Sequence, residues 1–222
     1  MNQDQWNAVD KYFVQALVGP DQALDSALSA NLGAGLPPID VSPTQGKLLH
    51  LIATIQGARR VLEIGTLGGY STIWLARALP PNGLLVSLEA EERHASVAQG
   101  NIDRAGVGQI VRIVVGNALD TLIRLRTEYS EPFDLIFIDA DKPNTSEYFK
   151  WALRLSRPGT VVIVDNVVRK GEILDPNSPD LSVQGMRRFI EMLSNETRVM
   201  ATAIQTVGSK GYDGFVIARV VS

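Results

Sequence analysis

Residues 61–72, which read VLEIGTLGGYST, contain the change of pattern that decides the fold. The apolar run at 61–64 predicts a short buried strand, three glycines follow it, and a helical pattern begins near residue 70. Glycines in such a turn let the backbone approach a ligand closely, because no Cβ atom stands in the way. In an open parallel sheet this turn faces the ligand-binding crevice, so the stretch predicts a binding site at the carboxyl end of its strand.

Strands and helices alternate along the rest of the chain. Further buried strands are expected at 84–88, 111–115, 133–138 and 160–164, with helices at about 70–79, 91–105, from 117, after Pro143 and at 180–194. Two last strands, at about 198–204 and 214–220, flank a glycine-rich turn and predict an antiparallel hairpin at the sheet edge. The pattern predicts an α/β fold with a doubly wound, mostly parallel sheet that is covered on both faces.

The first 58 residues are expected to be helical. Three helices are predicted there, ending at Gly19-Pro20, near residue 31 and at Gly57. Positions with helical spacing form the apolar side of the first helix and of the third: Val9, Tyr12, Phe13, Ala16 and Leu17, then Leu48, Leu49, Ile52 and Ile55. Because 222 residues are few for two domains, we expect a single domain over 1–222, with 1–58 as a lid or dimer element and 59–222 as the sheet.

The composition excludes several kinds of active site. The chain has no cysteine and two histidines, so a disulfide framework, a thiolate nucleophile and a three-histidine metal site are impossible. Its 21 basic and 24 acidic side chains give a net charge of −3, which does not favour a nucleic-acid partner. The polar N-terminus lacks the features of a targeting signal, and no apolar run approaches the roughly 20 residues of a membrane span. We therefore expect a cytoplasmic protein that does not bind a membrane.

Two acidic residues favour a particular ligand for the glycine turn. Leu67 stands where the dinucleotide fingerprint G-x-G-x-x-G would need its middle glycine. Glu89, at the end of the second strand, can accept hydrogen bonds from the two hydroxyls of a ribose, whereas Glu63 would repel a pyrophosphate. The pair favours an adenosyl ligand without phosphates, and the cation S-adenosylmethionine fits that electrostatics. The alternative is a tight turn that binds no ligand.

Three motifs resemble one enzyme family. Residues 61–72, FIDADK at 137–142 and VDNV at 164–167 look like the class I, cation-dependent O-methyltransferases, the group of catechol and caffeoyl-CoA O-methyltransferases. The similarity runs from about residue 43 to residue 220. It implies a seven-stranded, Rossmann-like methyltransferase fold with an antiparallel last strand, S-adenosylmethionine as donor, and Mg²⁺ or a similar cation. It also implies a homodimer and a vicinal diphenol acceptor, either a catechol or a hydroxycinnamoyl compound.

The second and third motifs carry a candidate metal site. In the seven-stranded fold the strands that precede Asp139 and Asp165 are neighbours, so both aspartates and Asn166 reach the same crevice. Two carboxylates and an amide oxygen are hard ligands that suit Mg²⁺, with Mn²⁺ or Ca²⁺ as alternatives. Such a set leaves coordination positions open for two adjacent hydroxyls. An aspartate at a strand end can instead cap the following helix.

The resemblance also implies roles for single residues. The family's equivalent of Lys142 lies beside the reacting hydroxyl, where a nearby cation disfavours the ammonium form and makes the lysine a base. Val41 corresponds to a residue near the methionine portion of the cofactor, Ser71 to one that binds its carboxylate, and Ala118 to a position beside adenine. The remaining cofactor contacts are assigned to Glu63, Gly65, Thr66, Gly69, Glu89 and Asp139.

Several alternatives remain open from the sequence. A nicotinamide dehydrogenase on a similar sheet and a non-catalytic adenosyl-binding module are the two other functions considered. Arg169 and Lys170 follow the metal motif and could attract an acidic acceptor, or form a solvated loop. Tyr212 and Asp213 could contact the acceptor, but an inserted-looking stretch before Asp213 weakens that transfer from the family.

Overall fold

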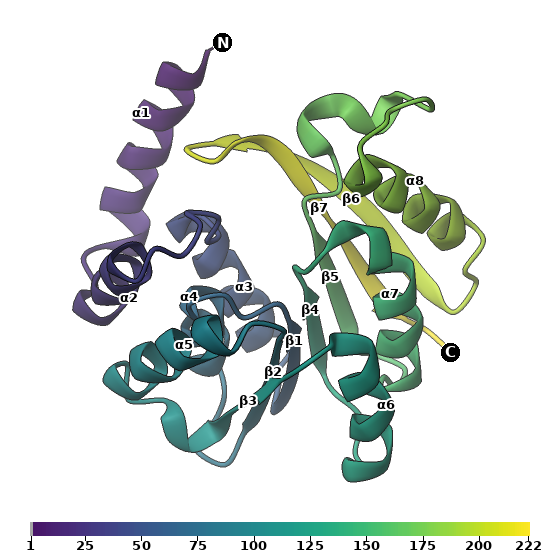
Figure 1. Ribbon diagram of the computed structural model, residues 1–222, viewed down its shortest axis with the longest axis horizontal. Coiled ribbons are helices and arrows are strands. Elements are labelled where there is room, and N and C mark those ends of the chain that lie inside the picture. Colours follow the sequence, from purple (N-terminus) through teal and green to yellow (C-terminus); the bar gives the residue numbers. More distant parts are fainter. Residues whose placement is uncertain (1) are drawn as a thin grey trace.

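The computed structural model describes residues 2–222, whose strands form one seven-stranded sheet in the order β3-β2-β1-β4-β5-β7-β6 (Figure 1). The five parallel strands are β1 (Arg60–Ile64), β2 (Leu84–Glu89), β3 (Val111–Val115), β4 (Leu135–Ile138) and β5 (Val161–Asp165). Two further strands, β6 (Val199–Gly208) and β7 (Gly211–Val220), pair antiparallel with each other, and β7 pairs antiparallel with β5. The predicted doubly wound, seven-stranded sheet is confirmed.

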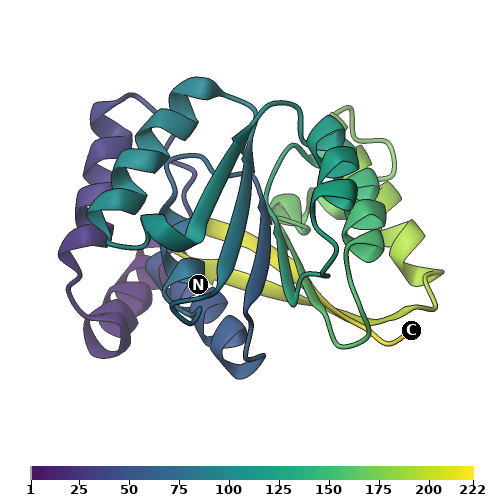
Figure 2. The same ribbon diagram turned by 90° about the horizontal axis from the view of Figure 1, so that it is seen from below.

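Helices cover both faces of the sheet (Figures 1 and 2). One face packs against α2 (Gln22–Gly33), α3 (Pro43–Ile55), α4 (Tyr70–Ala76) and α5 (Glu92–Arg104), and the other against α6 (Ala118–Glu128), α7 (Thr145–Arg154) and α8 (Leu181–Ser194). Alternate residues of each strand supply the two cores: Val61 and Phe137 point to the first, Leu62 and Ile138 to the second. This explains why the strands read as nearly continuous apolar runs. None of the helices within residues 2–222 is long and apolar enough to cross a membrane.

The strand order reverses between β1 and β4, which creates the crevice. From β1 the chain continues to β2 and β3 on one side, and from β4 to β5 on the other. The register pairs Ile64 with Ile138 and Ile138 with Val164, so the residues that follow all three strands begin at the same level. Ligands of open α/β sheets bind at such a switch point.

The N-terminal helices form where expected, but much of their predicted apolar side is exposed. The first helix, α1 (Gln3–Phe13), continues into a short π-helix, Val14–Val18, and its apolar residues are largely exposed: Val9, Tyr12, Phe13 and Leu17. In α3, Leu49 is buried as predicted and Ile52 packs against the core, but Ile55 is 84% exposed, and the small residues Gly46 and Ala53 complete the buried stripe. A Cβ atom at Gly46 would lie 2.3 Å from Cδ1 of Trp74, so α3 approaches α4 along its small residues.

The C-terminal hairpin is longer than predicted. Its register runs from the pair Val199–Val220 to the pair Gly208–Gly211, which leaves only residues 209 and 210 as the turn. The glycine-rich segment is therefore mostly strand, and at Gly214 a Cβ atom would lie 2.3 Å from the carbonyl oxygen of Ile204. The hairpin tip reaches α1, where the Gln3 amide donates to the Gly208 carbonyl (2.8 Å) and the Ser209 N–H to Asp10 (2.7 Å).

Candidate functional site

A cavity of about 770 Å³ opens along the carboxyl ends of the parallel strands. Most of the residues predicted to form the site line it: Val41, Gly65, Thr66, Ser71, Glu89, Ala118, Asp139, Lys142 and Asn166. Asp165 instead lines a neighbouring cavity of about 260 Å³, which Asn166 also lines. Glu63 is buried beneath the first cavity, and Gly69 starts α4 behind it. The structure thus brings together residues as far apart in the chain as Val41 and Asn166.

The glycine turn is shaped by close contacts with its surroundings. Gly65 has a φ of 100°, and a Cβ atom there would lie 2.1 Å from the Asp139 carbonyl oxygen. A Cβ atom at Gly68 would lie 1.9 Å from the side chain of Asn31, and the Gly68 carbonyl accepts a hydrogen bond from Asn101 (2.8 Å). Asn31 and Asn101 are bonded to each other at 2.9 Å. This asparagine pair was not predicted, because each asparagine lies on a different helix and belongs to no sequence motif.

Glu89 holds the same turn from the end of β2. Its Oε2 accepts hydrogen bonds from the N–H groups of Thr66 (3.2 Å) and Leu67 (2.7 Å), and its Oε1 accepts from that of Glu91 (3.0 Å). The carboxylate therefore orders the turn while it lines the cavity. Carboxylate oxygens have further acceptor capacity, so the predicted contact with ribose hydroxyls is compatible with these bonds.

Glu63 is a fully buried acid under the cavity floor. Three hydroxyl groups donate to its carboxylate, those of Ser71 (2.6 Å), Thr72 and Ser87 (2.7 Å). Burial raises the pKa of Glu63 to about 7, the negative charge of Asp139 adds to the rise, and the three hydroxyls oppose it. A cationic ligand above this residue would favour its ionised form.

The candidate metal ligands converge at the ends of β4 and β5. Asp139 accepts a hydrogen bond from Nζ of Lys142 at 2.7 Å. Asp165 accepts at Oδ1 from the Asn166 N–H (2.7 Å) and at Oδ2 from the side chain of Gln45 (2.5 Å). Burial and, second to it, the charge of Asp139 together raise the pKa of Asp165 to about 7, against the opposing effects of Lys142 and of these two hydrogen bonds. Gln45, on α3, was not predicted, since nothing in its own motif links it to a residue 120 positions away.

This donor set fits a hard divalent cation. Its three members offer only oxygen, two carboxylates and one amide, and Asn166 adopts a left-handed φ of 58° directly after the strand. Within residues 2–222 no three His, Cys, Asp or Glu side chains lie together in a way that could hold a metal ion, so a cation at Asp139 and Asp165 would need a further oxygen such as that of the Asn166 amide. The pKa of Asp165 is raised first by burial and second by the charge of Asp139, and a cation bound there would favour the ionised form of both acids.

Lys142 is buried and positioned by its neighbours. It is 8% exposed, and α8 packs directly on its backbone, where a Cβ atom at Gly185 would lie 2.3 Å from the Lys142 carbonyl oxygen. Asp141 does not orient it, because that carboxylate accepts hydrogen bonds from Tyr148 and from Asn144 (2.6 Å). Asp139 is the acid that holds Lys142.

Asp213 shapes the loop that follows the metal motif. Its Oδ1 accepts hydrogen bonds from the N–H groups of Val168, Arg169 and Gly214, each at 3.0 Å. Both Arg169 and Lys170 adopt left-handed φ values, 53° and 56°. The Tyr212 hydroxyl donates to Gln205 on β6. Asp213 thus connects β7 to the loop, a role that the sequence left open.

Comparisons with known proteins agree on one family. A family model described as O-methyltransferase matches residues 22–220. A catechol O-methyltransferase of Niastella koreensis is 54% identical over 220 residues, 99% of this chain and 100% of that protein. The crystal structure of an O-methyltransferase from Bacillus cereus with S-adenosylhomocysteine has a TM-score of 0.97 at 57% identity, covering 99% of this chain and 100% of the other. The O-methyltransferase TomG of Streptomyces achromogenes, with S-adenosylmethionine, has a TM-score of 0.97 at 55% identity and covers both chains fully, 100% each. This chain is therefore an enzyme of the O-methyltransferase family.

Proposed function

We propose that this enzyme transfers the methyl group of S-adenosylmethionine to one hydroxyl of a vicinal diphenol, with a divalent cation at Asp139, Asp165 and Asn166. One observation carries the proposal: Asp139 belongs to two parts of the site at once. Its backbone abuts Gly65 of the glycine turn, and its side chain holds Lys142 beside the candidate metal ligands. A methyl donor in the turn and an acceptor at the metal ligands would therefore be adjacent.

The cofactor assignment has support from charge as well as from related structures. Glu63 and Asp139 place two acids by the turn, which favours a sulfonium cation over the pyrophosphate of a dinucleotide. Ser71, Glu89, Val41 and Ala118 line the cavity at positions suited to the methionine and adenosine portions. These residues, together with the family membership, disfavour the dehydrogenase alternative.

The oxygen donors favour Mg²⁺, with Mn²⁺ or Ca²⁺ as alternatives. A cation bound there would attract both hydroxyls of the acceptor and favour their ionised form. Asn166 would contribute its amide oxygen, and Gln45 would keep Asp165 oriented through the 2.5 Å hydrogen bond.

Lys142 is the proposed base, acting in its neutral form, which a cation at the neighbouring ligands would favour. Its Nζ would accept the proton of the attacking hydroxyl, whose oxygen forms a bond to the methyl carbon as the carbon–sulfur bond breaks and its electron pair remains on sulfur. Asp139 fixes the position of Nζ, and the burial of Lys142 keeps bulk water from the reacting oxygen. No covalent intermediate with the enzyme is needed.

Residues 1–58 are proposed to cover the acceptor side and to contribute to a homodimer. Asp10, Thr44 and Leu48 line the smaller cavity beside Asp165, so α1 and α3 border the place that an acceptor would occupy. A second copy of the chain could bury the exposed side chains of Tyr12 and Ile55.

The direct test is methylation of catechol and caffeate with labelled S-adenosylmethionine and Mg²⁺, Mn²⁺ or Ca²⁺ in turn. Asp165→Ala and EDTA should each reduce turnover at least about 100-fold, because one ligand or the cation itself is lost. Asp120→Asn, on the exposed start of α6, is the control and should retain activity. Unchanged methylation in EDTA or in Asp165→Ala would refute the metal-dependent reaction.

A further inference from the structure

We propose that Arg169 recognises a carboxylate on the acceptor, so that the preferred substrate is a vicinal diphenol whose ring or side chain carries a carboxylate. The inference rests on the proposed function, since it requires the diphenol to lie at Asp165 and Asn166. Arg169 follows Asn166 by three residues and lines the same cavity as Asn166 and Lys142.

The backbone presents Arg169 in a fixed way. Its φ of 53° lies in the left-handed region, which arginine adopts rarely. The N–H groups of Val168 and Arg169 both donate to Asp213, whose own position is set by strand β7. The side chain is half-buried, whereas that of the following residue, Lys170, is exposed. The loop therefore holds one cation at the cavity wall and leaves the next one in solvent.

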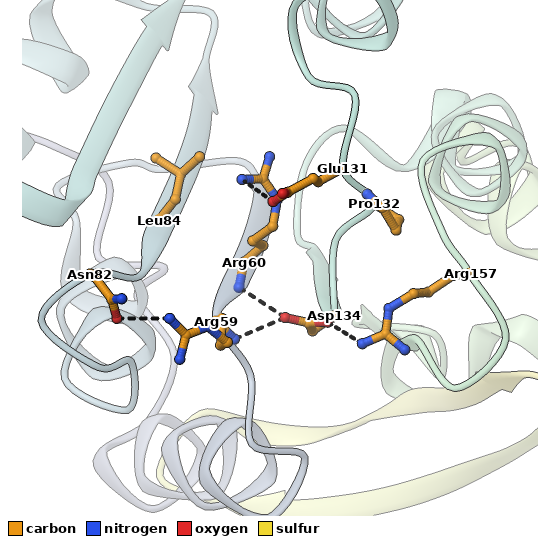
Figure 3. Close-up of a pocket in the computed structure, with 8 residues that line it drawn as sticks. All are labelled: Arg59, Arg60, Asn82, Leu84, Glu131, Pro132, Asp134 and Arg157. Atoms are coloured by element: carbon orange, nitrogen blue, oxygen red, sulfur yellow. Dashed lines mark hydrogen bonds and ion pairs between the residues drawn. The ribbon is translucent and has the colours of Figure 1, made fainter.

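The guanidinium of Arg169 has no protein partner within residues 2–222. None of its N–H groups makes a hydrogen bond or an ion pair there, and its Nε is buried without an acceptor. Arg157, at the other end of the sheet, shows the contrasting case: its Nη2 lies 2.6 Å from Asp134 (Figure 3). Leaving a buried donor unpaired is unfavourable, and a planar carboxylate can accept two parallel hydrogen bonds from such a group.

No acid of residues 2–222 forms an ion pair with Arg169. Lys142 is paired with Asp139 at 2.7 Å, and Asp141 accepts hydrogen bonds from Tyr148 and Asn144. Arg169 is therefore a cation at the cavity wall whose guanidinium has no ion-pair partner, although acids outnumber bases around the cavity as a whole. A neutral diphenol would leave Nε of Arg169 unpaired, and an acceptor with an ammonium group could not pair with it.

The test measures binding, which does not require turnover. Protein loaded with S-adenosylhomocysteine and Mg²⁺ is titrated by calorimetry with 3,4-dihydroxybenzoate and with catechol. The wild type should bind the dihydroxybenzoate more tightly. In Arg169→Gln the affinity for dihydroxybenzoate should fall about 10- to 100-fold, the range for loss of a charged hydrogen-bonded pair, and that for catechol should change less than about twofold. Arg169→Lys should retain part of the preference.

Lys170→Gln is the matched control, because it removes one positive charge from the adjacent, exposed position. It should change both affinities equally and slightly. Three results would overturn the inference: no preference in the wild type, equal losses for both ligands in Arg169→Gln, or binding of neither ligand. Methylation of catechol in a separate assay tests the proposed function, so a selective binding loss without turnover would refute the reaction while supporting the carboxylate site.

Discussion

The two ends of the sheet place the same residue type in opposite situations. At the amino ends, Asp134 accepts hydrogen bonds from the backbone N–H groups of Arg59 (2.9 Å) and Arg60 (3.0 Å) and from Arg157 (2.6 Å), as Figure 3 shows. Burial alone would raise its pKa, but these donors outweigh burial and lower it. At the carboxyl ends, burial and the charge of Asp139 raise the pKa of Asp165 to about 7.

The difference shows that the protein itself stabilises the charged form of Asp134, whereas the charged form of Asp165 is unfavourable without a bound partner. The cavity of about 440 Å³ around Asp134 is lined by three arginines: Arg60 and Arg157 form ion pairs with Glu131 and Asp134, and Arg59 donates to the side chain of Asn82. At the other end two carboxylates share one lysine. Acids whose charged form the protein leaves unfavourable cluster at functional sites, so the pKa directions distinguish the two ends.

The largest effect is expected when the cation is removed from each of the two cation–acid pairs in turn. Lys142→Met should lower kcat at least about 100-fold, because a general base contributes roughly 10²–10⁴ to the rate. Arg157→Met removes a cation from an equally close pair, 2.6 Å against 2.7 Å, and should leave kcat within about twofold. Initial rates with catechol decide the matter. Similar rates for Lys142→Met and the wild type would contradict the role of Lys142.

Replacing Asp134 should lower stability rather than the catalytic rate. Asp134→Ala is expected to lower the free energy of unfolding by about 1 to 3 kcal/mol, mainly because it leaves two backbone N–H groups without their acceptor, while the half-exposed Arg157 is screened by water. Its folded-state pKa lies below the ordinary aspartate value of 3.8, so its contribution is present above about pH 4 and is lost as the pH falls through the folded pKa. Urea unfolding at pH 7 and pH 3 measures both effects. A variant as stable as the wild type at pH 7 would contradict this account.

The sequence predicted the carboxyl-end site far better than its amino-end counterpart, for a physical reason. Asp139, Lys142 and Asp165 stand in short motifs whose position after a strand decides where they point. Asp134 also lies beside a strand, but its partners are N–H groups 74 and 75 residues earlier, which no local pattern marks.

The buried faces of the N-terminal helices were likewise only partly predictable from the sequence. Helical spacing identified the existence of α1 and α3, but the residues that α3 buries depend on Trp74, which excludes any side chain at Gly46. Gln45 likewise reaches Asp165 only because α3 packs where it does. Contacts between distant elements are set by packing, and a sequence pattern does not contain them.

The effect of Glu63 on the pH dependence of unfolding tests whether the acids at the carboxyl ends of the strands destabilise the fold. Its pKa is about 7 in the folded protein and 4.5 for the free side chain, so the folded state binds more protons than the unfolded state between these values. Stability should therefore fall as the pH rises from about 5 to about 7.5, by about 2 to 3 kcal/mol from this group. This slope is opposite in sign to that of Asp134. Unfolding of ligand-free Glu63→Gln should lack that part of the pH dependence, and an identical slope in wild type and variant would rule out the assignment.

The smallest expected effect concerns Asp165 itself. Asp165→Asn preserves the side-chain shape: its oxygen can still accept from the Asn166 N–H, and its NH2 group can donate to Oε1 of Gln45 once the Gln45 amide is reversed. The substitution also removes the repulsion between Asp165 and Asp139 at the ends of neighbouring strands. In EDTA the variant should be more stable than the wild type by about 1 kcal/mol, because a buried like-charge contact is lost without leaving a donor unpaired. Asp134→Asn, with the same chemical change, should be destabilised. If both variants lost stability equally, the two ends would not differ in the way that their hydrogen bonds indicate, and Asp165 would be a structural acid like Asp134.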